Sequence, residues 1–354
     1  MQLTQAQRER ARALHEPTLV VAGHTDISAD VVDQRWSGRR AVVAERHLPV
    51  FRTGGIGAIF EHVGGDGPYF DNFPFRSIAA PTRLGLTLRA IDALECDLAE
   101  APGQVVRATT VAEIEAARRN GQVAIVYCLE GAMPIEDDLA LLRTFYRLGV
   151  RCAGLTWNHR NQLADGVSVG TDAGLTALGV AAVAEMNRLG ILIDVSHLND
   201  GGTWHTLEVS RQPIVASHSN CRTVCDHPRN VTDDMIKAIA KGGGLVGVHA
   251  MSMLISPEPP PTLDQMLDHV EHVVKIAGED YVAIGPDLME NWPLEVYERS
   301  TMGGFKFLYP EEFDTLAKFP NITAGLVARG HSDEAIKKII GGNWLRVCRA
   351  VWGS

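Results

Sequence analysis

A histidine and an aspartate stand two positions apart at the end of the apolar run "VVAGHTD", which spans residues 20–26. In an extended segment, residues i and i+2 point to the same side, so the side chains of His24 and Asp26 can reach one ion. Imidazole and carboxylate ligands without clustered thiolates suit Zn²⁺, and Mn²⁺, Fe²⁺ and Co²⁺ accept the same donors. The pair predicts a metal site, with a strand that merely ends in polar residues as the alternative.

Seven further apolar runs also end in groups that can bind a metal or transfer a proton. These groups are Glu61 with His62, Glu130, Asn158 with His159, His197, His218, His249 and Asp287. Each has an ordinary explanation on its own, because a strand-end acid often caps the next helix. Brought to one place, several buried carboxylates and imidazoles would be costly without a cation. A carboxylate such as Glu130 can also span two ions that share a hydroxide, an arrangement that hydrolytic sites use repeatedly.

The elements that must position these groups are short apolar runs that alternate with helical patterns. The runs are rich in β-branched residues and too short for independent helices, so we predict strands. The predicted strands are residues 18–23, 56–61, 123–129, 151–157, 190–195, 213–217, 244–248 and 281–285. Helical patterns lie between them, for example at residues 134–149, 175–190, 232–243 and 262–278. Repeated strand–helix units indicate a parallel sheet.

Eight such units predict a (β/α)8 barrel of the TIM type, because strands that are apolar along their length are buried on both faces. A doubly wound open sheet is the alternative, but no glycine-rich phosphate turn follows the first strand. No low-complexity linker divides residues 1–354, so we predict one domain. Residues 64–109 and 288–320 are expected to form loops over the carboxyl ends of the strands, where the chemistry of such a barrel lies.

The composition restricts the partners and the compartment. A formal net charge of −10 without a basic tract argues against binding to nucleic acid or anionic lipid. The charged N-terminal segment lacks the apolar core of a signal peptide, and no stretch approaches the roughly 20 apolar residues of a membrane span, so we expect a cytoplasmic protein. Six cysteines in 354 residues do not indicate a disulfide framework, and Cys221 with Cys225 would form only half of a zinc site.

An ordered set of motifs resembles the renal, or membrane, dipeptidase family of the amidohydrolase-like superfamily. The motifs are "HTD", "LEGA", "IDVSHLND", "PIVASHSN", "HPRNVTDDMI", "AIGPD" and "NITAGLVARGHSDEAIKKIIGGNWLRV". Each motif alone is weak, but together they run in order along nearly the whole chain. The resemblance implies a metallopeptidase with two zinc ions. His24 and Asp26 would bind one ion, His197 and His218 the other, and Glu130 would bridge them.

The resemblance also implies how the reaction proceeds. A metal-bridged hydroxide would attack the amide bond of a small dipeptide, with a D-residue accepted on the carboxyl side. Asp287 would position the bridging water, take its proton and pass it to the leaving amine. Arg229 would bind a substrate carboxylate, a task for which a planar guanidinium is well shaped.

Departures from the family pattern bear mainly on the substrate. Family members best known as dipeptidases have "LTHN" or a similar sequence after the fourth strand, and its histidine contacts the reacting carbonyl. This chain has Trp157 there. His159 either replaces that histidine or shapes a different pocket. Met289 stands where relatives often have a second acid. Glu61, His62 and His249 also differ from the animal enzymes. Glu61 and His62 are candidate pocket residues, and the more common role of such residues is to support the metal ligands.

Three hypotheses follow, with the dipeptidase in the lead. A dinuclear amidohydrolase or lactonase acting on a non-peptide metabolite is the alternative, because Trp157 and the aromatic-rich loop after the eighth strand would shape a different pocket. A non-catalytic binder would be expected to have lost ligands, and the set is intact. Apolar outer helices such as "EAIKKIIGGNWLRVCRAVW" favour a homodimer.

Overall fold

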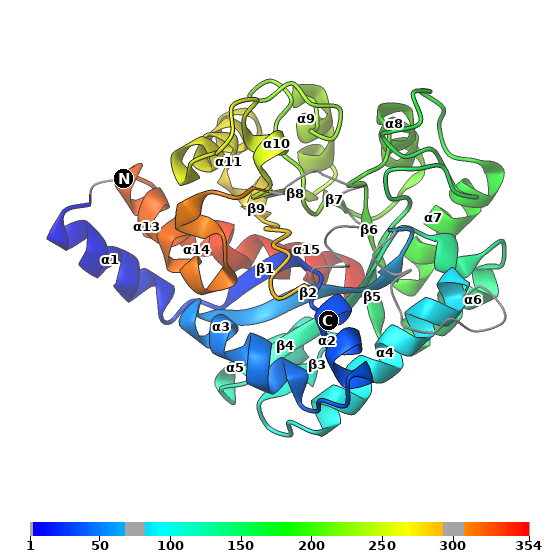
Figure 1. The fold of residues 1–354 in the computed structure, drawn as a ribbon. Helices are drawn as coiled ribbons and strands as arrows, with labels where there is room; N and C mark the ends of the chain where they lie inside the picture. Colours follow the sequence, from blue (N-terminus) through cyan, green and yellow to red (C-terminus); the bar gives the residue numbers. More distant parts are fainter. Residues whose placement is uncertain (1–2, 68–81, 293–307, 354) are drawn as a thin grey trace.

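The centre of the molecule is a ring of parallel strands (Figure 1). The computed structural model describes residues 3–67, 82–292 and 308–353. Each strand of the ring is hydrogen-bonded in parallel to the next. The strands are β1 (Val20–Thr25), β2 (Ile56–Gly65), β4 (Val123–Glu130), β5 (Val150–Gly154), β6 (Leu192–Asp194), β7 (Ile214–Ala216), β8 (Leu245–Val248) and β9 (Val282–Ile284). Because β9 and β1 also lie in contact, the eight strands form a nearly closed barrel, and the predicted (β/α)8 fold is confirmed.

All eight predicted strands are present, and the main difference lies in the second. β2 continues to Gly65, beyond its predicted end at residue 61, so Glu61 and His62 lie within the strand. A short further strand, β3 (Val105–Arg107), was not predicted. It pairs with the first residues of β4, whose last residues pair with β5. β3 therefore lies beside the ring and is not one of its eight strands.

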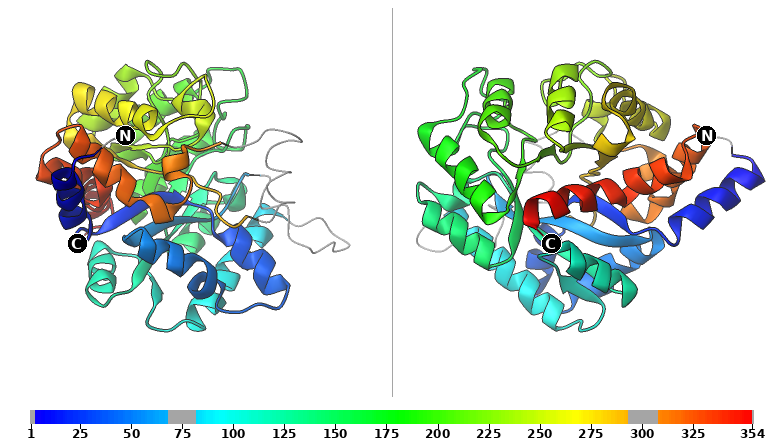
Figure 2. Two further views of the ribbon diagram at one scale, coloured as in Figure 1. Left: turned by 60° about the vertical axis from the view of Figure 1, so that its left-hand side comes forward. Right: turned by 180° about the vertical axis from the view of Figure 1, so that it is seen from behind.

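Helices surround the ring and connect its strands (Figure 2). They are α1 (Gln5–His15), α2 (Ser28–Trp36), α3 (Leu48–Thr53), α4 (Arg83–Ala99), α5 (Val111–Arg119), α6 (Leu139–Arg147), α7 (Ala177–Leu189), α8 (Asp200–Val209), α9 (Asp233–Lys241), α10 (Ser252–Ile255), α11 (Leu263–Ala277), α13 (Pro320–Ala328), α14 (Asp333–Lys337) and α15 (Asn343–Trp352). Several begin at a capping threonine. Thr110, for example, accepts the N–H of Glu113 and donates its own N–H to the Glu113 carboxylate, which satisfies two otherwise free backbone donors.

The two predicted loop regions are only partly loops. Within residues 64–109 the prediction was wrong for α4, whose Leu86, Ala90 and Leu94 recur at helical spacing and are buried. Residues 68–81 of this region lie outside the described residues. In the second region, residues 293–307 lie outside the described residues, and two short 3₁₀ turns, 311–313 and 316–318, follow them.

The interior of the barrel below the carboxyl ends of the strands is apolar. Inward-facing strand residues form one cluster with α15, which lies across the amino end of the strands (Figure 2). Trp344 of α15 packs against Phe60, with 4.8 Å between ring centroids, and donates its indole N–H to the carbonyl oxygen of Ile284. A Cβ atom at Gly23 would lie 2.0 Å from the Trp344 ring, so only glycine fits directly before His24.

The structure bears on three expectations from the composition, which concern a membrane span, the cysteines and a cysteine zinc site. No helix in the described part of the chain is both long enough and apolar enough to cross a membrane. All six cysteines are free thiols. Neither Cys221 nor Cys225 belongs to a group of described residues that could hold a metal ion. The cytoplasmic location and the homodimer stay predictions.

Candidate metal centre

The five predicted metal ligands meet at the carboxyl end of the barrel. His24 and Asp26 come from the end of β1, Glu130 ends β4, and His197 and His218 follow β6 and β7. All five side chains are buried. They converge because the parallel strands of a barrel direct their carboxyl ends to one rim.

Glu130 lies at the middle of this cluster. Its Oε1 is 3.0 Å from Nε2 of His197, 3.4 Å from Nε2 of His218 and 3.8 Å from Nε2 of His24. Nε2 of His24 in turn lies 3.2 Å from Oδ2 of Asp26. His24, Glu130 and His218 form a group whose donor atoms are close enough together to hold one ion. The central carboxylate is therefore within reach of both predicted ligand pairs.

Hydrogen bonds determine which ring nitrogen of His197 and of His218 faces the cluster. Nδ1 of His197 donates to Oδ1 of Asn158 at 2.7 Å. The Ser217 hydroxyl donates to Asp194, so it accepts from Nδ1 of His218, at 2.7 Å. Both Nε2 atoms are left with lone pairs, and they lie 2.9 Å apart. Because two lone pairs at this distance repel each other unless a cation lies nearby, the donor set fits a metal ion.

The charge balance of the cluster supports the same conclusion. Burial alone would lower the pKa of His24, but the carboxylates of Asp26, Asp287 and Glu130 raise it to about 10. Three buried carboxylates therefore attract positive charge to one point. Nδ1 of His24 and Oδ1 of Asp26 also have no hydrogen-bond partner among the described residues. Buried anions are stabilised when they coordinate a metal, so the residues present fit the cofactor.

His62 also lies at this cluster, where the sequence predicted a supporting residue and not a possible ligand. It extends inward from β2, and its ring stacks on that of His24, with 3.9 Å between centroids. His24, Asp26 and His62 form a second group that could hold a metal ion. Burial, followed by the charge of His24, lowers the pKa of His62 to about 3. His62 is therefore a neutral imidazole.

Asp287 lies beside the cluster and is held by His249. The N–H of Met251 donates to Nδ1 of His249 at 2.7 Å, so the proton of the neutral ring is on Nε2, which donates to Oδ2 of Asp287 at 2.8 Å. Oδ1 of Asp287 lies 3.4 Å from Nε2 of His24. Burial opposes ionisation, but His24 and His249 together hold the pKa of Asp287 well below its usual range. Asp287 is therefore an oriented carboxylate with one oxygen directed to the cluster.

Two of these site residues have an unusual backbone conformation. His197 has a φ of 69° and Asp287 a φ of 51°. The left-handed region costs a residue with a side chain roughly 1–2 kcal/mol. Strain of this kind gathers at functional sites, where the surrounding structure enforces it.

Arg229 is a buried cation near the cluster. Its Nη1 donates to the Ser219 hydroxyl at 2.7 Å, whereas Nη2 has no partner among the described residues. Burial lowers the pKa of Arg229 to about 10. Burial, followed by the charge of Arg229, also lowers the pKa of His197 to about 4. A buried guanidinium with an unused donor suits an anionic ligand.

Three consecutive residues after β5, Trp157, Asn158 and His159, point in different directions. Trp157 is half-buried, and its ring centroid lies 5.7 Å from that of His197. Asn158 turns inward to hydrogen-bond His197, whereas His159 is exposed and its ring contacts that of Trp157, at 5.8 Å. Asp66 anchors the segment by accepting the N–H of Trp157. The structure therefore does not bring His159 to the metal ligands, although the sequence suggested that it replaces a carbonyl-binding histidine.

Glu61 faces away from the cluster, on the opposite side of β2 from His62. Its carboxylate accepts the hydroxyl of Thr25 and the N–H groups of Ile27 and Ser28. Burial raises the pKa of Glu61 to about 7, although these hydrogen bonds oppose the change. Glu61 therefore holds the turn after β1 in place and is not among the groups of described residues that could hold a metal ion.

Residues 288–292, at the start of the second predicted loop region, reach the site. The indole N–H of Trp292 donates to the backbone carbonyl oxygen of Asp26 at 2.8 Å. Glu290 instead accepts the N–H of Leu316 at 3.1 Å. Glu290 therefore does not replace the acid that relatives often have at the position of Met289.

The residues that orient the ligands were missed by the sequence reasoning. Asp194 and Ser217 fix His218, Ser219 contacts Arg229, and Asp66 anchors the segment after β5. The only sequence signal was the closeness of an acid and of serines to the histidines in "IDVSH" and "ASHSN".

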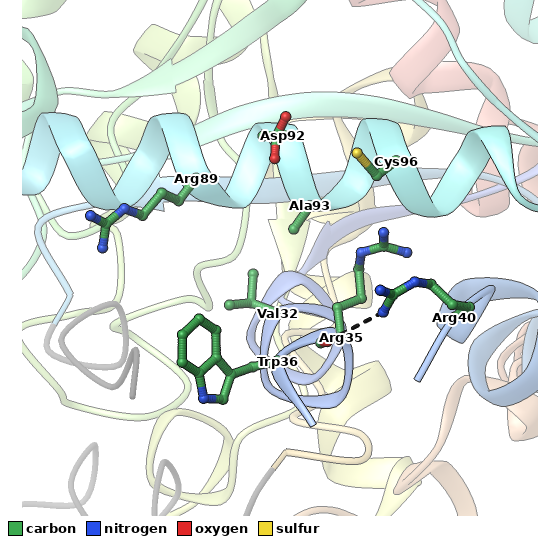
Figure 3. Close-up of a pocket in the computed structure, with 8 residues that line it drawn as sticks. All are labelled: Val32, Arg35, Trp36, Arg40, Arg89, Asp92, Ala93 and Cys96. Carbon is green, nitrogen blue, oxygen red and sulfur yellow. Dashed lines mark hydrogen bonds between the residues drawn. The ribbon is translucent and has the colours of Figure 1, made fainter. Parts of the chain in front are cut away.

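A separate surface pocket lies between α2 and α4 (Figure 3). Its volume is about 300 Å³, and Trp36, Arg35, Arg40, Arg89, Val32, Asp92, Ala93 and Cys96 line it. Arg35 is paired with Asp97 and Glu100, and Arg40 hydrogen-bonds the carbonyl oxygen of Arg35. None of the predicted site residues lines this pocket, so it is not part of the metal centre.

A barrel that brings histidines and carboxylates to one buried point at the carboxyl ends of its strands is typical of metal-dependent hydrolases. Comparison with known proteins gives the family. The family model described as "Membrane dipeptidase (Peptidase family M19)" matches residues 8–352. The chain therefore belongs to the membrane dipeptidase family, and it is a hydrolase of the metallo-dipeptidase class.

Individual relatives agree with this assignment. Dipeptidase verJ of Clonostachys rogersoniana is 33% identical over 76% of this chain and 66% of its own length. Among solved structures, an amidohydrolase from Pseudomonas aeruginosa is 28% identical, with a TM-score of 0.83 over 97% of this chain and 99% of the other. Dipeptidase AC, a metallopeptidase of family M19, is 26% identical, with a TM-score of 0.81 over 96% of this chain and 100% of the other.

Proposed function

We propose that this chain uses two zinc ions to hydrolyse the amide bond of small dipeptides, including those with a D-residue on the carboxyl side. The observation that carries the proposal is the buried Arg229, whose Nη2 has no partner among the described residues. A buried guanidinium N–H group without an acceptor is unfavourable, and the free carboxylate of a dipeptide would supply that acceptor. Family membership and the metal-compatible cluster support the chemistry.

The five ligands divide between the two ions as follows. His24 and Asp26 would hold one ion and His197 and His218 the other, and Glu130 lies within reach of both pairs. When bound, the ions polarise the substrate carbonyl and lower the pKa of a water molecule. The chain holds these donor atoms in position before an ion binds. Asn158 accepts from Nδ1 of His197 and Ser217 accepts from Nδ1 of His218, so the Nε2 lone pairs of both histidines face Glu130.

Asp287 handles the proton. Its Oδ2 accepts from His249, so Oδ1 remains to accept a proton from the attacking water. The same oxygen then gives that proton to the leaving amine nitrogen. His249 fixes the carboxylate in this orientation and is itself held by the N–H of Met251.

Arg229 orients the substrate. Its guanidinium binds the terminal carboxylate and so places the amide bond of a short substrate at the cluster. The contact therefore favours substrates whose scissile amide bond lies next to a free C-terminal carboxylate, as it does in a dipeptide.

A panel of L-L and L-D dipeptides with zinc-loaded protein tests this function. Each substrate is compared with its C-terminal amide, which keeps the size and removes the negative charge. We expect hydrolysis of the free acids and a large rise in KM for the amides. A zinc-loaded protein that hydrolyses no dipeptide would overturn the proposal.

A second candidate function is hydrolysis of a non-peptide amide or lactone, and Trp157 is the observation that favours it. Its half-buried ring lies 5.7 Å from that of His197, where dipeptidases of the family have a carbonyl-binding histidine. Arg229→Met separates the two functions. If activity on the preferred substrate barely changes, no carboxylate is bound there and the second function stands.

A further inference from the structure

His62 is a buried imidazole at the metal cluster that the five-ligand set does not use. We propose that His62 is an additional protein ligand of the ion held by His24 and Asp26. This inference rests on the metal-binding part of the proposed function and is independent of the substrate. With His62, the first ion would have three protein ligands of its own, besides the shared carboxylate of Glu130, in place of two.

The position of His62 allows direct coordination. Its ring lies parallel to that of His24 within 27°, with 3.9 Å between centroids. One donor atom from each of His24, Asp26 and His62 lies within 4.8 Å of the others. Two ligands on one tetrahedral ion with bonds of about 2.1 Å are about 3.4 Å apart. Small side-chain shifts would therefore place all three on a common ion.

The hydrogen bonds of His62 leave the correct nitrogen unprotonated. Nδ1 lies 3.4 Å from the carbonyl oxygen of Thr25. A carbonyl only accepts, so the proton is on Nδ1 and the lone pair is on Nε2. Nε2 is buried and has no hydrogen-bond partner among the described residues. Metal-binding histidines typically donate one N–H to a carbonyl and coordinate through the other nitrogen.

An ordinary structural role does not account for this nitrogen. A buried acceptor without a partner costs about 1–3 kcal/mol. A phenylalanine would preserve the ring stack on His24 without that cost. Glu61, the neighbour on the same strand, has its carboxylate fully engaged with the turn after β1. The contrast between these two adjacent residues singles out Nε2 of His62 as an unused metal donor.

The additional ligand makes the two metal positions unequal. One position has His24, Asp26, His62 and the shared Glu130, which amounts to the four protein ligands of a closed zinc site. The other has His197, His218 and Glu130, which leaves a coordination position open for water or substrate. We therefore expect one tightly bound ion and one that exchanges more readily.

Zinc titration of metal-free protein against a chromophoric chelator tests this inference. Wild type should show a tight and a weaker Kd. In His62→Phe, the tight Kd should rise by about 100-fold or more. Loss of a residue that only supports a ligand costs about 10–100-fold in metal affinity, and loss of a ligand should cost at least as much. The weaker Kd should not change. His159→Phe makes the same substitution at an exposed histidine of the same rim, and both of its Kd values should match wild type. Two unchanged Kd values in His62→Phe would overturn the inference.

A crystal structure of zinc-loaded wild type removes any dependence on the folding of the variant. Nε2 of His62 at about 2.0–2.1 Å from an ion supports the inference, and Nε2 beyond about 3 Å from every ion overturns it. The two proposals fail in different ways. Zinc bound through His62 without any hydrolysis of dipeptides contradicts only the proposed substrate, and dipeptide hydrolysis with His62 away from the metal contradicts only this inference.

Discussion

The two ends of the barrel interior are lined by the same strands and differ completely in chemistry. Toward the amino end, Phe60, Trp344 and neighbouring apolar side chains fill the interior. At the carboxyl end, the next inward positions are His62 on β2 and Glu130 on β4. One step along a strand therefore changes the lining from apolar to ionisable.

The two ends also differ in the polar atoms that face the interior of the barrel. The indole N–H of Trp344 has its acceptor, the carbonyl oxygen of Ile284. At the other end, buried atoms of His24, Asp26 and His62 have no partner among the described residues. Packing at the amino end stabilises the fold. At the carboxyl end, buried polar atoms without partners destabilise the fold unless a ligand binds them. The residues that stabilise the protein and those that carry its function therefore lie at opposite ends of the barrel.

The largest expected effect is that of metal removal. Dialysis against a chelator should abolish hydrolysis, by about 10³-fold or more, because the ions supply several kcal/mol of transition-state stabilisation. It should also lower Tm, since the ions bind only the native state. Activity assays and thermal melts before and after zinc is restored measure both. Metal-free protein that keeps its activity would contradict the assignment of the carboxyl end.

Asp287→Asn tests the proton carrier at the carboxyl end. We expect kcat to fall by about 10²- to 10⁴-fold, the usual contribution of a positioned acid or base. The metal content should stay that of wild type, because the five metal ligands remain. Steady-state kinetics and metal analysis measure the two effects. A variant with wild-type kcat would remove Asp287 from the reaction.

Trp344→Ala tests the amino end. The cavity should lower the free energy of unfolding by about 3–5 kcal/mol, as measured by urea denaturation. Zinc stoichiometry of the folded protein should not change, because no metal ligand is touched. Trp344→Phe is the milder control if the alanine variant does not fold. Loss of zinc from a folded Trp344 variant would show that the two ends are not independent.

The smallest of these effects is expected at Arg229. Arg229→Met should lower kcat/KM for free dipeptides by about 30-fold or more, since truncating one partner of a buried charge pair costs at least about 2 kcal/mol. Dipeptide amides should be nearly unaffected. Parallel kinetics on acids and amides separate the charge effect from a general loss of folding, which would lower both.

The sequence allowed good prediction of the strands and of the residues at their ends. Parallel strands direct their carboxyl ends to one rim, so finding the apolar runs was enough to group His24, Glu130 and His218. The sequence placed Glu61 and His62 near the metals but could not separate them, because β2 runs past both and only the register decides which one faces inward.

Other contacts depend on the folded chain in the same way. Several contacts that fix the imidazoles join residues that are far apart in sequence, as Ser217 with Asp194 and Asn158 with His197 do. α4 was not predicted, because its helical spacing lies inside the long region 64–109, which has the features of a loop. His159 and Asn158 are neighbours, and only the turn after β5 decides that Asn158 faces His197.

The most direct test of the account is to add zinc stepwise to metal-free protein while following hydrolysis of an L-D dipeptide. The account predicts two zinc ions per chain, with little activity after the first equivalent and a steep rise between the first and the second. Saturation at a single ion, or two bound ions without hydrolysis of any dipeptide, would contradict it.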